Sequence, residues 1–100
     1  MENLFAKTLN KKKQKVITDF IIYYKSEKIR VKYTAYWSHI FLENNEEFIM
    51  DHFEFYSKVT SNTHYRSEFI SRKDMKGLGY KEVALEMIKE LAKNYEPKLL

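Results

Sequence analysis

Apolar residues occupy every second position from Ile29 to Trp37. The positions between them hold Arg30, Lys32, Thr34 and Tyr36. A period of two, built from β-branched and aromatic residues, is typical of a strand with one buried face. Residues 29–37 therefore predict a half-buried strand.

The segment before this strand has the same period but admits two interpretations. As a strand, it forms a hairpin that turns around Ser26-Glu27 and places its apolar face beside that of residues 29–37. The predicted pairs are Tyr24 with Ile29, Ile22 with Val31, Phe20 with Tyr33 and Val16 with Trp37. As a helix over residues 14–25, it would present a stripe of Ile17, Phe20, Ile21 and Tyr24.

Residues 38–52 predict either a loop or a short helix that Asn44 and Glu47 would cap as a capping box.

A second hairpin is predicted from Phe53 to Ser71, turning at Ser61-Asn62-Thr63 with Asn62 left-handed. This register places Phe55 opposite Phe69 and Val59 opposite Tyr65. It also brings Lys58 beside Arg66, a like-charge pair that an anionic partner would relieve.

The last third predicts a helix after Gly77-Leu78-Gly79, with Pro97 ending it. Its apolar stripe consists of Tyr80, Ala84, Met87, Ile88, Leu91 and Tyr95. The pairs Glu86–Lys89 and Glu90–Lys93 lie on its solvent side.

Residues 1–15 are open to two interpretations, a short helix capped by Asn3 or a mobile basic arm.

Together these elements predict one α+β domain over residues 1–100. The expected architecture is an antiparallel sheet of about four strands, made of two hairpins, with the C-terminal helix packed on one face. One hundred residues suffice for a single core.

Composition narrows the function classes. The chain has no cysteine, which excludes disulfides, thiolate metal sites and a cysteine nucleophile. The first residues lack the apolar core of a signal peptide, and no apolar run has the length of a membrane span, so the expected compartment is the cytoplasm. The net charge of +4 suits an anionic partner, either nucleic acid or an acidic protein surface.

The residue spacings and motifs give little support for catalysis or metal binding. His39, His52 and His64 lie in three different segments without the spacing of a metal clip. No nucleophile-elbow sequence is present, and Asp51, His52 and Glu54 are not tied to any pocket motif. We therefore expect no enzyme activity, no metal and no cofactor.

Two sets of residues are candidates for binding. The outward strand positions combine tyrosine and arginine, which dominate binding hot spots, with lysine for electrostatic steering. This predicted partner-binding set is Tyr23, Arg30, Lys32, Tyr36, Tyr56, Lys58 and Arg66. A second set, suited to phosphate or nucleic acid, is Lys11, Lys12, Lys13, Lys15, Arg72, Lys73, Lys76 and Lys81. The glycines before the helix could also leave backbone N–H groups free for an anion, although they equally serve a sharp turn.

The stretch Gly77-Leu78-Gly79-Tyr80-Lys81 with Ala84 resembles the helix start of double-stranded-RNA-binding domains over about a quarter of the chain. It lacks that family's second lysine, since Glu82 follows Lys81, and it lacks the proline of the first strand. The resemblance implies a nucleic-acid contact for Lys81 alone.

In general character, as a short, cysteine-free, Lys/Asn/Tyr-rich α+β domain, the chain is similar to small phage and mobile-element proteins of the anti-CRISPR type. That resemblance implies a protein that occupies and blocks the surface of a host nucleic-acid enzyme. We therefore expect a non-enzymatic protein-binding module, with a small basic domain that binds double-stranded RNA or DNA as the alternative.

Overall fold

The computed structural model describes residues 12–95. In this range the chain forms a four-stranded antiparallel sheet in the order β1-β2-β3-β4, followed by a short 3₁₀ helix and one α-helix. The strands are β1 (Val16–Tyr24), β2 (Glu27–Phe41), β3 (Glu47–Tyr56) and β4 (Arg66–Ser71), and the helices are η1 (Arg72–Met75) and α2 (Tyr80–Leu91). The predicted α+β class, the sheet and the C-terminal helix are confirmed.

Residues 16–24 form a strand, so the helical interpretation of 14–25 is wrong. The strand pairs as predicted with β2, but in a register shifted by two residues, with Ile22 opposite Ile29 and Phe20 opposite Val31. The cause is a tighter turn than expected. Only Lys25 and Ser26 separate the paired residues Tyr24 and Glu27, and both have positive φ, as a type I′ turn requires. Because the shift is an even number of residues, the predicted apolar faces still coincide.

The segment 38–52, predicted as a loop or short helix, instead forms the end of β2 and most of β3. A turn over residues 42–46 joins them, closed by the Leu42 N–H donating to the Glu46 carbonyl at 2.9 Å. The Asn44 side chain accepts from the Glu46 N–H at 3.0 Å, and Asn45 adopts φ 64°. Asn44 therefore stabilises a hairpin turn and not the start of a helix.

The register predicted for the second hairpin is wrong. Phe55 lies opposite Arg66, and Phe69 lies opposite His52. β3 ends at Tyr56 and β4 begins only at Arg66. The residues between them form a compact loop in which the Ser57 hydroxyl accepts a hydrogen bond from the Val59 N–H. His64, and not Asn62, takes the left-handed conformation in this loop.

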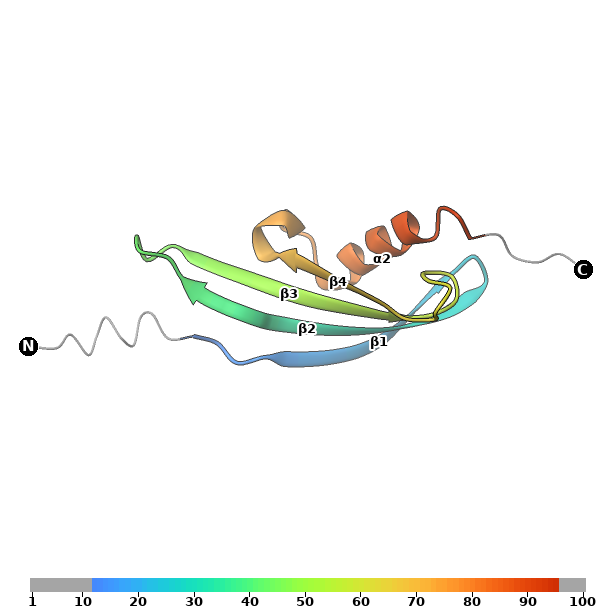
Figure 1. Cartoon of the computed structure of the whole chain (residues 1–100), viewed down its shortest axis with the longest axis horizontal. Helices are drawn as coiled ribbons and strands as arrows, with labels where there is room; N and C mark the ends of the chain where they lie inside the picture. Colours follow the sequence, from blue (N-terminus) through green and yellow to red (C-terminus); the bar gives the residue numbers. More distant parts are fainter. Residues whose placement is uncertain (1–11, 96–100) are drawn as a thin grey trace, which may run out of the picture.

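One face of the sheet packs against α2, which lies with η1 on that side (Figure 1). The core joins β2, β3, the loop after β3 and the helices. Its fully enclosed members include Ile29, Val31, Phe53, Phe55, Ala84 and Ile88. Tyr80 at the start of α2 stacks on Tyr33 with ring centroids 4.8 Å apart, which fixes the helix against the centre of the sheet.

The helix stripe is largely as predicted, with Ala84 and Ile88 buried and Tyr80, Met87, Leu91 and Tyr95 packed against the core. Both predicted ion pairs of the solvent side form, Lys89–Glu86 at 3.3 Å and Lys93–Glu90 at 2.8 Å. The helix ends at Leu91, so Pro97, which lies outside the described residues, does not end it. Gly77 has φ 77° and Gly79 is the N-cap of α2, so these two glycines serve the turn between η1 and α2.

Candidate functional site: the open face of the sheet

The two faces of the sheet differ in whether a helix or loop packs on them. In the part of the chain that the structure describes, no helix or loop is packed across the face opposite α2 (Figure 1). We call this surface the open face. Its residues alternate along the strands with those of the core, so it includes Ile21 and Tyr23 of β1, Arg30 and Lys32 of β2, His52 and Glu54 of β3, and Phe69 of β4.

A bulge in β2 decides which aromatic residues reach the open face. The β2–β3 register shifts between Thr34 and Ser38, and Tyr36 within it has φ 55°. The strict alternation predicted through Trp37 is therefore broken, and the two neighbouring rings exchange sides. Trp37, predicted to point inward, packs on the open face with His52 and Phe69, whereas Tyr36, predicted to point outward, packs with Arg72 and His39.

Asp51 holds this bulge in place from the helix side. Its carboxylate is fully buried and accepts from the Tyr36 N–H at 2.9 Å and from the Tyr33 hydroxyl at 2.8 Å. Arg72 adds two more bonds, Nε to Oδ2 at 2.7 Å and Nη2 to Oδ1 at 2.9 Å. Burial alone would raise the pKa of Asp51, but these donors together hold it below its ordinary value. The same contacts raise the pKa of Arg72, so the pair remains ionised.

Three rings form a continuous aromatic row across β2, β3 and β4. His52 lies between the other two, with ring centroids 4.5 Å from Trp37 and 4.3 Å from Phe69. Trp37 and Phe69 meet edge to face at 5.6 Å. Phe69 is 52% exposed and Trp37 39% exposed, whereas His52 beneath them is buried. We call Trp37, His52 and Phe69 the aromatic row.

Charged groups flank the aromatic row on both sides. The Lys15 ammonium sits 3.9 Å from the centroid of the Trp37 ring, a close cation–π contact. On the other side, the Glu54 carboxylate lies 3.9 Å from Lys32 Nζ and accepts hydrogen bonds from the hydroxyls of Tyr56 at 3.2 Å and Tyr65 at 2.8 Å. Cations and hydrogen-bonding tyrosines thus border an apolar centre.

Burial lowers the pKa of His52, with Glu54 acting in the opposite direction. The imidazole is therefore neutral near neutral pH. Its Nδ1 is buried without a hydrogen-bond partner, at 3.9 Å from Glu54 Oε2. A neutral histidine between two rings behaves as a further flat aromatic surface, which keeps the centre of the open face apolar.

Large apolar side chains extend this surface beyond the aromatic row. Those of the strands that stay exposed on the open face are Ile17, Ile21, Tyr23, Ile40 and Phe48. Single exposed apolar residues are ordinary, but a contiguous set over one sheet face marks an interaction surface.

The predicted partner-binding set is only partly brought together. Tyr23, Arg30, Lys32 and Tyr56 share the open face, and Tyr23 is 71% exposed. Arg30 pairs with Asp19 at 3.2 Å and lies over the Tyr56 ring.

Three members of the set lie elsewhere, and their predicted positions are wrong. Tyr36 is on the opposite side because of the bulge. Arg66 shares the face of Phe55 and pairs with Glu68 at 2.8 Å. Lys58 lies in the loop after β3 and pairs with Glu27 at 3.6 Å, so the predicted Lys58–Arg66 like-charge pair does not form.

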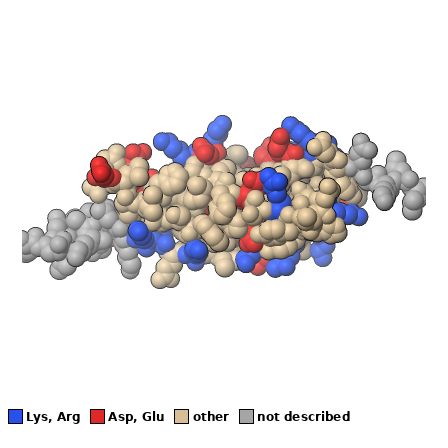
Figure 2. Space-filling model, viewed as in Figure 1, with Lys and Arg blue, Asp and Glu red and all other residues tan. Residues whose placement is uncertain are grey.

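The predicted nucleic-acid set does not form one surface. Lys15 borders the aromatic row, whereas Lys81 lies 5.9 Å from Phe20 at the start of α2. Arg72 is committed to Asp51, while Lys73 belongs to η1 and Lys76 caps it. Lys12 and Lys13 precede β1, and Lys11 lies outside the described residues. On the side of the molecule drawn in Figure 2, Lys and Arg are interleaved with Asp and Glu.

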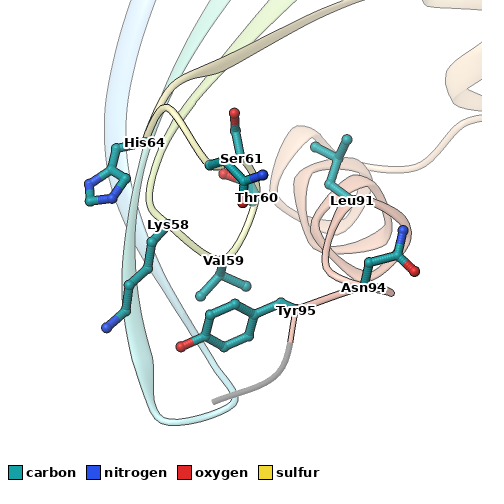
Figure 3. A pocket seen from close by; sticks show the side chains of 9 residues that line it. Lys58, Val59, Thr60, Ser61, His64, Leu91, Asn94 and Tyr95 are labelled. Atoms are coloured by element: carbon teal, nitrogen blue, oxygen red, sulfur yellow. The ribbon is translucent and has the colours of Figure 1, made fainter. Parts of the chain in front are cut away.

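A hollow of about 740 Å³ lies between the loop after β3 and the C-terminal end of α2 (Figure 3). Its polar side chains are those of Lys58, Thr60, Ser61, Asn62, His64, Asn94 and Tyr95, and no carboxylate is among the described residues that line it. No group of three His, Asp or Glu residues in the range 12–95 is arranged to hold a metal ion.

Comparison with protein-family models, with curated proteins and with solved structures finds no match for this chain. No helix among the described residues is long and apolar enough to cross a membrane.

Sequence reasoning missed Trp37, His52 and Phe69 as site residues. The available signal was weak. In Phe69-Ile70, adjacent apolar residues must point to opposite faces of a strand, so one of them is exposed unless both faces are covered. His52 lies in a segment predicted as a loop or short helix, and Trp37 depended on the bulge at Tyr36, whose left-handed backbone could not be predicted from the residue type.

Proposed function

We propose that this protein is a non-enzymatic protein-binding module that uses the open face of its sheet. The observation that supports the proposal is the aromatic row, in which two exposed rings and a neutral histidine form an apolar centre on an uncovered face. Aromatic anchors surrounded by arginine and tyrosine are the composition of binding hot spots.

The partner that fits this face is a folded protein surface with an apolar centre and a carboxylate rim. Lys15 and Lys32 flank the aromatic row, and Arg30 lies further along the same face. With the net charge of +4, these cations favour an acidic partner and accelerate its encounter. The acidic surface of a host nucleic-acid enzyme, such as a CRISPR nuclease, has this chemistry, and occupation of that surface would block it sterically.

Two features favour protein over nucleic acid. Ile17, Ile21 and Ile40 enlarge the surface with aliphatic groups, which offer no flat ring for bases to stack on. In addition, Asp19 and Glu54 lie beside Arg30 and Lys32 on this face, and such mixed charge suits a protein surface better than the uniformly negative backbone of a nucleic acid.

The experiment is affinity capture with three forms of the protein, each analysed with and without nuclease treatment. The wild type and Leu78→Ala, a variant on the opposite side of the molecule, should capture the same partner. The double variant Trp37→Ala/Phe69→Ala should lose it. Equal capture by all three forms would reject the open face as the binding surface.

The nucleic-acid alternative is decided in the same series. Binding of duplex RNA, duplex DNA or single strands near micromolar concentration, weakening steeply between low and moderate salt, would replace the protein-binding proposal. The stacking of Lys15 on Trp37 is the feature that such a ligand would use.

A further inference from the structure

The outer edge of β1 is a second unpartnered feature, which borders the open face and shares Ile17, Ile21 and Tyr23 with it. β1 is the first strand in the sheet order, so within residues 12–95 only β2 pairs with it. Tyr24 and Glu27 flank the two-residue turn and form a hydrogen-bonded pair, and hydrogen-bonded pairs alternate along an antiparallel ladder. The backbone groups of Ile17, Asp19, Ile21 and Tyr23 consequently point outward, away from β2.

This edge lacks the features that usually protect a free strand. Natural edges are short, bulged, interrupted by proline or covered with lysine. β1 runs for nine residues without proline, and Asp19, already paired with Arg30, is its single charged residue. Val16, Ile17, Ile21 and Tyr23 are all exposed along it.

The opposite edge is different. β4 has six residues and leads directly into η1, which packs against β3 and β4. An edge this short, followed directly by a helix, offers few backbone N–H and C=O groups to a partner strand. A β1–β4 contact between copies would also be head-to-tail and would build a ring or an open filament, whereas a β1–β1 contact closes as a dimer.

We propose that two copies of this chain associate through antiparallel pairing of their β1 strands, with the two-fold axis at Phe20. Phe20 is the midpoint of Val16–Tyr24, so this register alone uses the full strand. It sets Ile17 opposite Tyr23 and Asp19 opposite Ile21 of the other copy, and it forms about eight backbone hydrogen bonds, two for each directly opposed pair with outward backbone groups. The product is one continuous sheet of both copies.

Charge does not oppose this arrangement. The register brings Lys15 of one copy near Lys25 of the other at each end of the seam. Lys15 extends over Trp37 on the open face, whereas Lys25 lies 5.7 Å from Tyr24, which shares the helix-side face of Phe20 and Ile22. The two ammonium groups therefore point to opposite sides of the sheet. The aromatic row stays uncovered, so the dimer would present two copies of it.

Sedimentation equilibrium from about 1 to 300 µM tests the proposal, because an interface of one strand pair is small and its Kd should be micromolar. The wild type should shift from monomer to dimer over this range, and added salt should not weaken the dimer. Ile21→Lys should remain monomeric, while Leu78→Lys should dimerise like the wild type. Ile21 and Leu78 are almost equally exposed, at 46% and 45%, so the two variants add the same charge to sites of equal burial. A wild type that stays monomeric at 300 µM overturns the proposal.

Cysteine cross-linking tests the register, because the chain has no cysteine of its own. Phe20→Cys places two thiols directly opposite each other across the axis, within the span of a disulfide. Thr18→Cys faces Ile22 of the other copy and should not cross-link. Disulfide formation by the position-18 variant and not by the position-20 variant would reject the register.

Discussion

The backbone N–H of Tyr36 donates to Oδ1 of Asp51 at 2.9 Å, and this bond ties the bulge of β2 to a buried carboxylate on β3. The bulge turns Tyr36 toward the helix side and Trp37 toward the open face. Arg72, at the start of η1, closes the same network from the end of the sheet. The arrangement of the aromatic row therefore depends on a polar cluster on the opposite face.

Removal of the Asp51 charge should destabilise the fold strongly. Asp51→Asn leaves Arg72 without its carboxylate and the Tyr33 hydroxyl with a poorer acceptor, at an expected cost of about 2 kcal/mol, discounted because Arg72 is partly exposed. The matched control is Asp19→Asn, which breaks an exposed ion pair with Arg30 and should cost less than about 0.5 kcal/mol. Urea unfolding of both variants measures the difference, and equal losses would show that the Asp51 network does not hold the bulge.

Two phenylalanines on opposite faces should lose different amounts of stability on truncation. Phe53→Ala removes a fully buried ring and should cost about 3–5 kcal/mol of unfolding free energy. Phe69→Ala removes a half-exposed ring and should cost less than about 1 kcal/mol while weakening partner binding. Thermal or urea unfolding compares them. A loss at Phe69 as large as that at Phe53 would mean that the open face is covered in solution.

The turn between β1 and β2 should accept a stabilising double substitution. Lys25 and Ser26 both have positive φ, where asparagine and glycine are favoured. Lys25→Asn with Ser26→Gly should raise the stability by about 1 kcal/mol, or roughly 4–8 °C in Tm. Thermal unfolding followed by circular dichroism provides the test. Destabilisation would indicate a turn of another type.

The stability should fall on mild acidification because of His52. Burial lowers the pKa of His52 in the folded state, so the unfolded chain takes up this proton first as the pH falls. The contribution of His52 is fully present above the ordinary histidine pKa and is lost as the pH falls through the lowered value. Urea unfolding between about pH 7.5 and 5.5 should show this loss. His52→Phe should reduce it, and His64→Gln, at an exposed site, should leave it unchanged.

The sequence predicted the elements of this structure whose hydrophobic pattern is periodic. The alternation from Ile29 to Tyr33 and the helical stripe around Ala84 and Ile88 are set by burial, which residue type reports directly. Single backbone events were not predictable in the same way. The left-handed Tyr36 and the loop that Ser57 organises depend on partners distant in sequence, or on local hydrogen bonds among common residues. Each event changes the register of the strand that follows. The register of β4 differs from the predicted one by an odd number of residues, so Arg66 and Phe69 lie on the opposite faces from those predicted.

The residues of the candidate site differ in the same way. Tyr23, Arg30, Lys32 and Tyr56 precede the bulge or lie opposite residues that precede it, so the sequence pattern placed them together correctly. Trp37, His52 and Phe69 meet only because the bulge and the second register bring them to one face.

We propose the aromatic row on the open face as the centre of a protein interface. Its most direct test is the Kd of the captured partner for the wild type, Trp37→Ala and Leu78→Ala, measured by calorimetry. We predict that Trp37→Ala weakens binding by about 30-fold or more, as the loss of a hot-spot residue does, and that Leu78→Ala changes it by less than about threefold. Equal affinities of the wild type and Trp37→Ala would contradict the account.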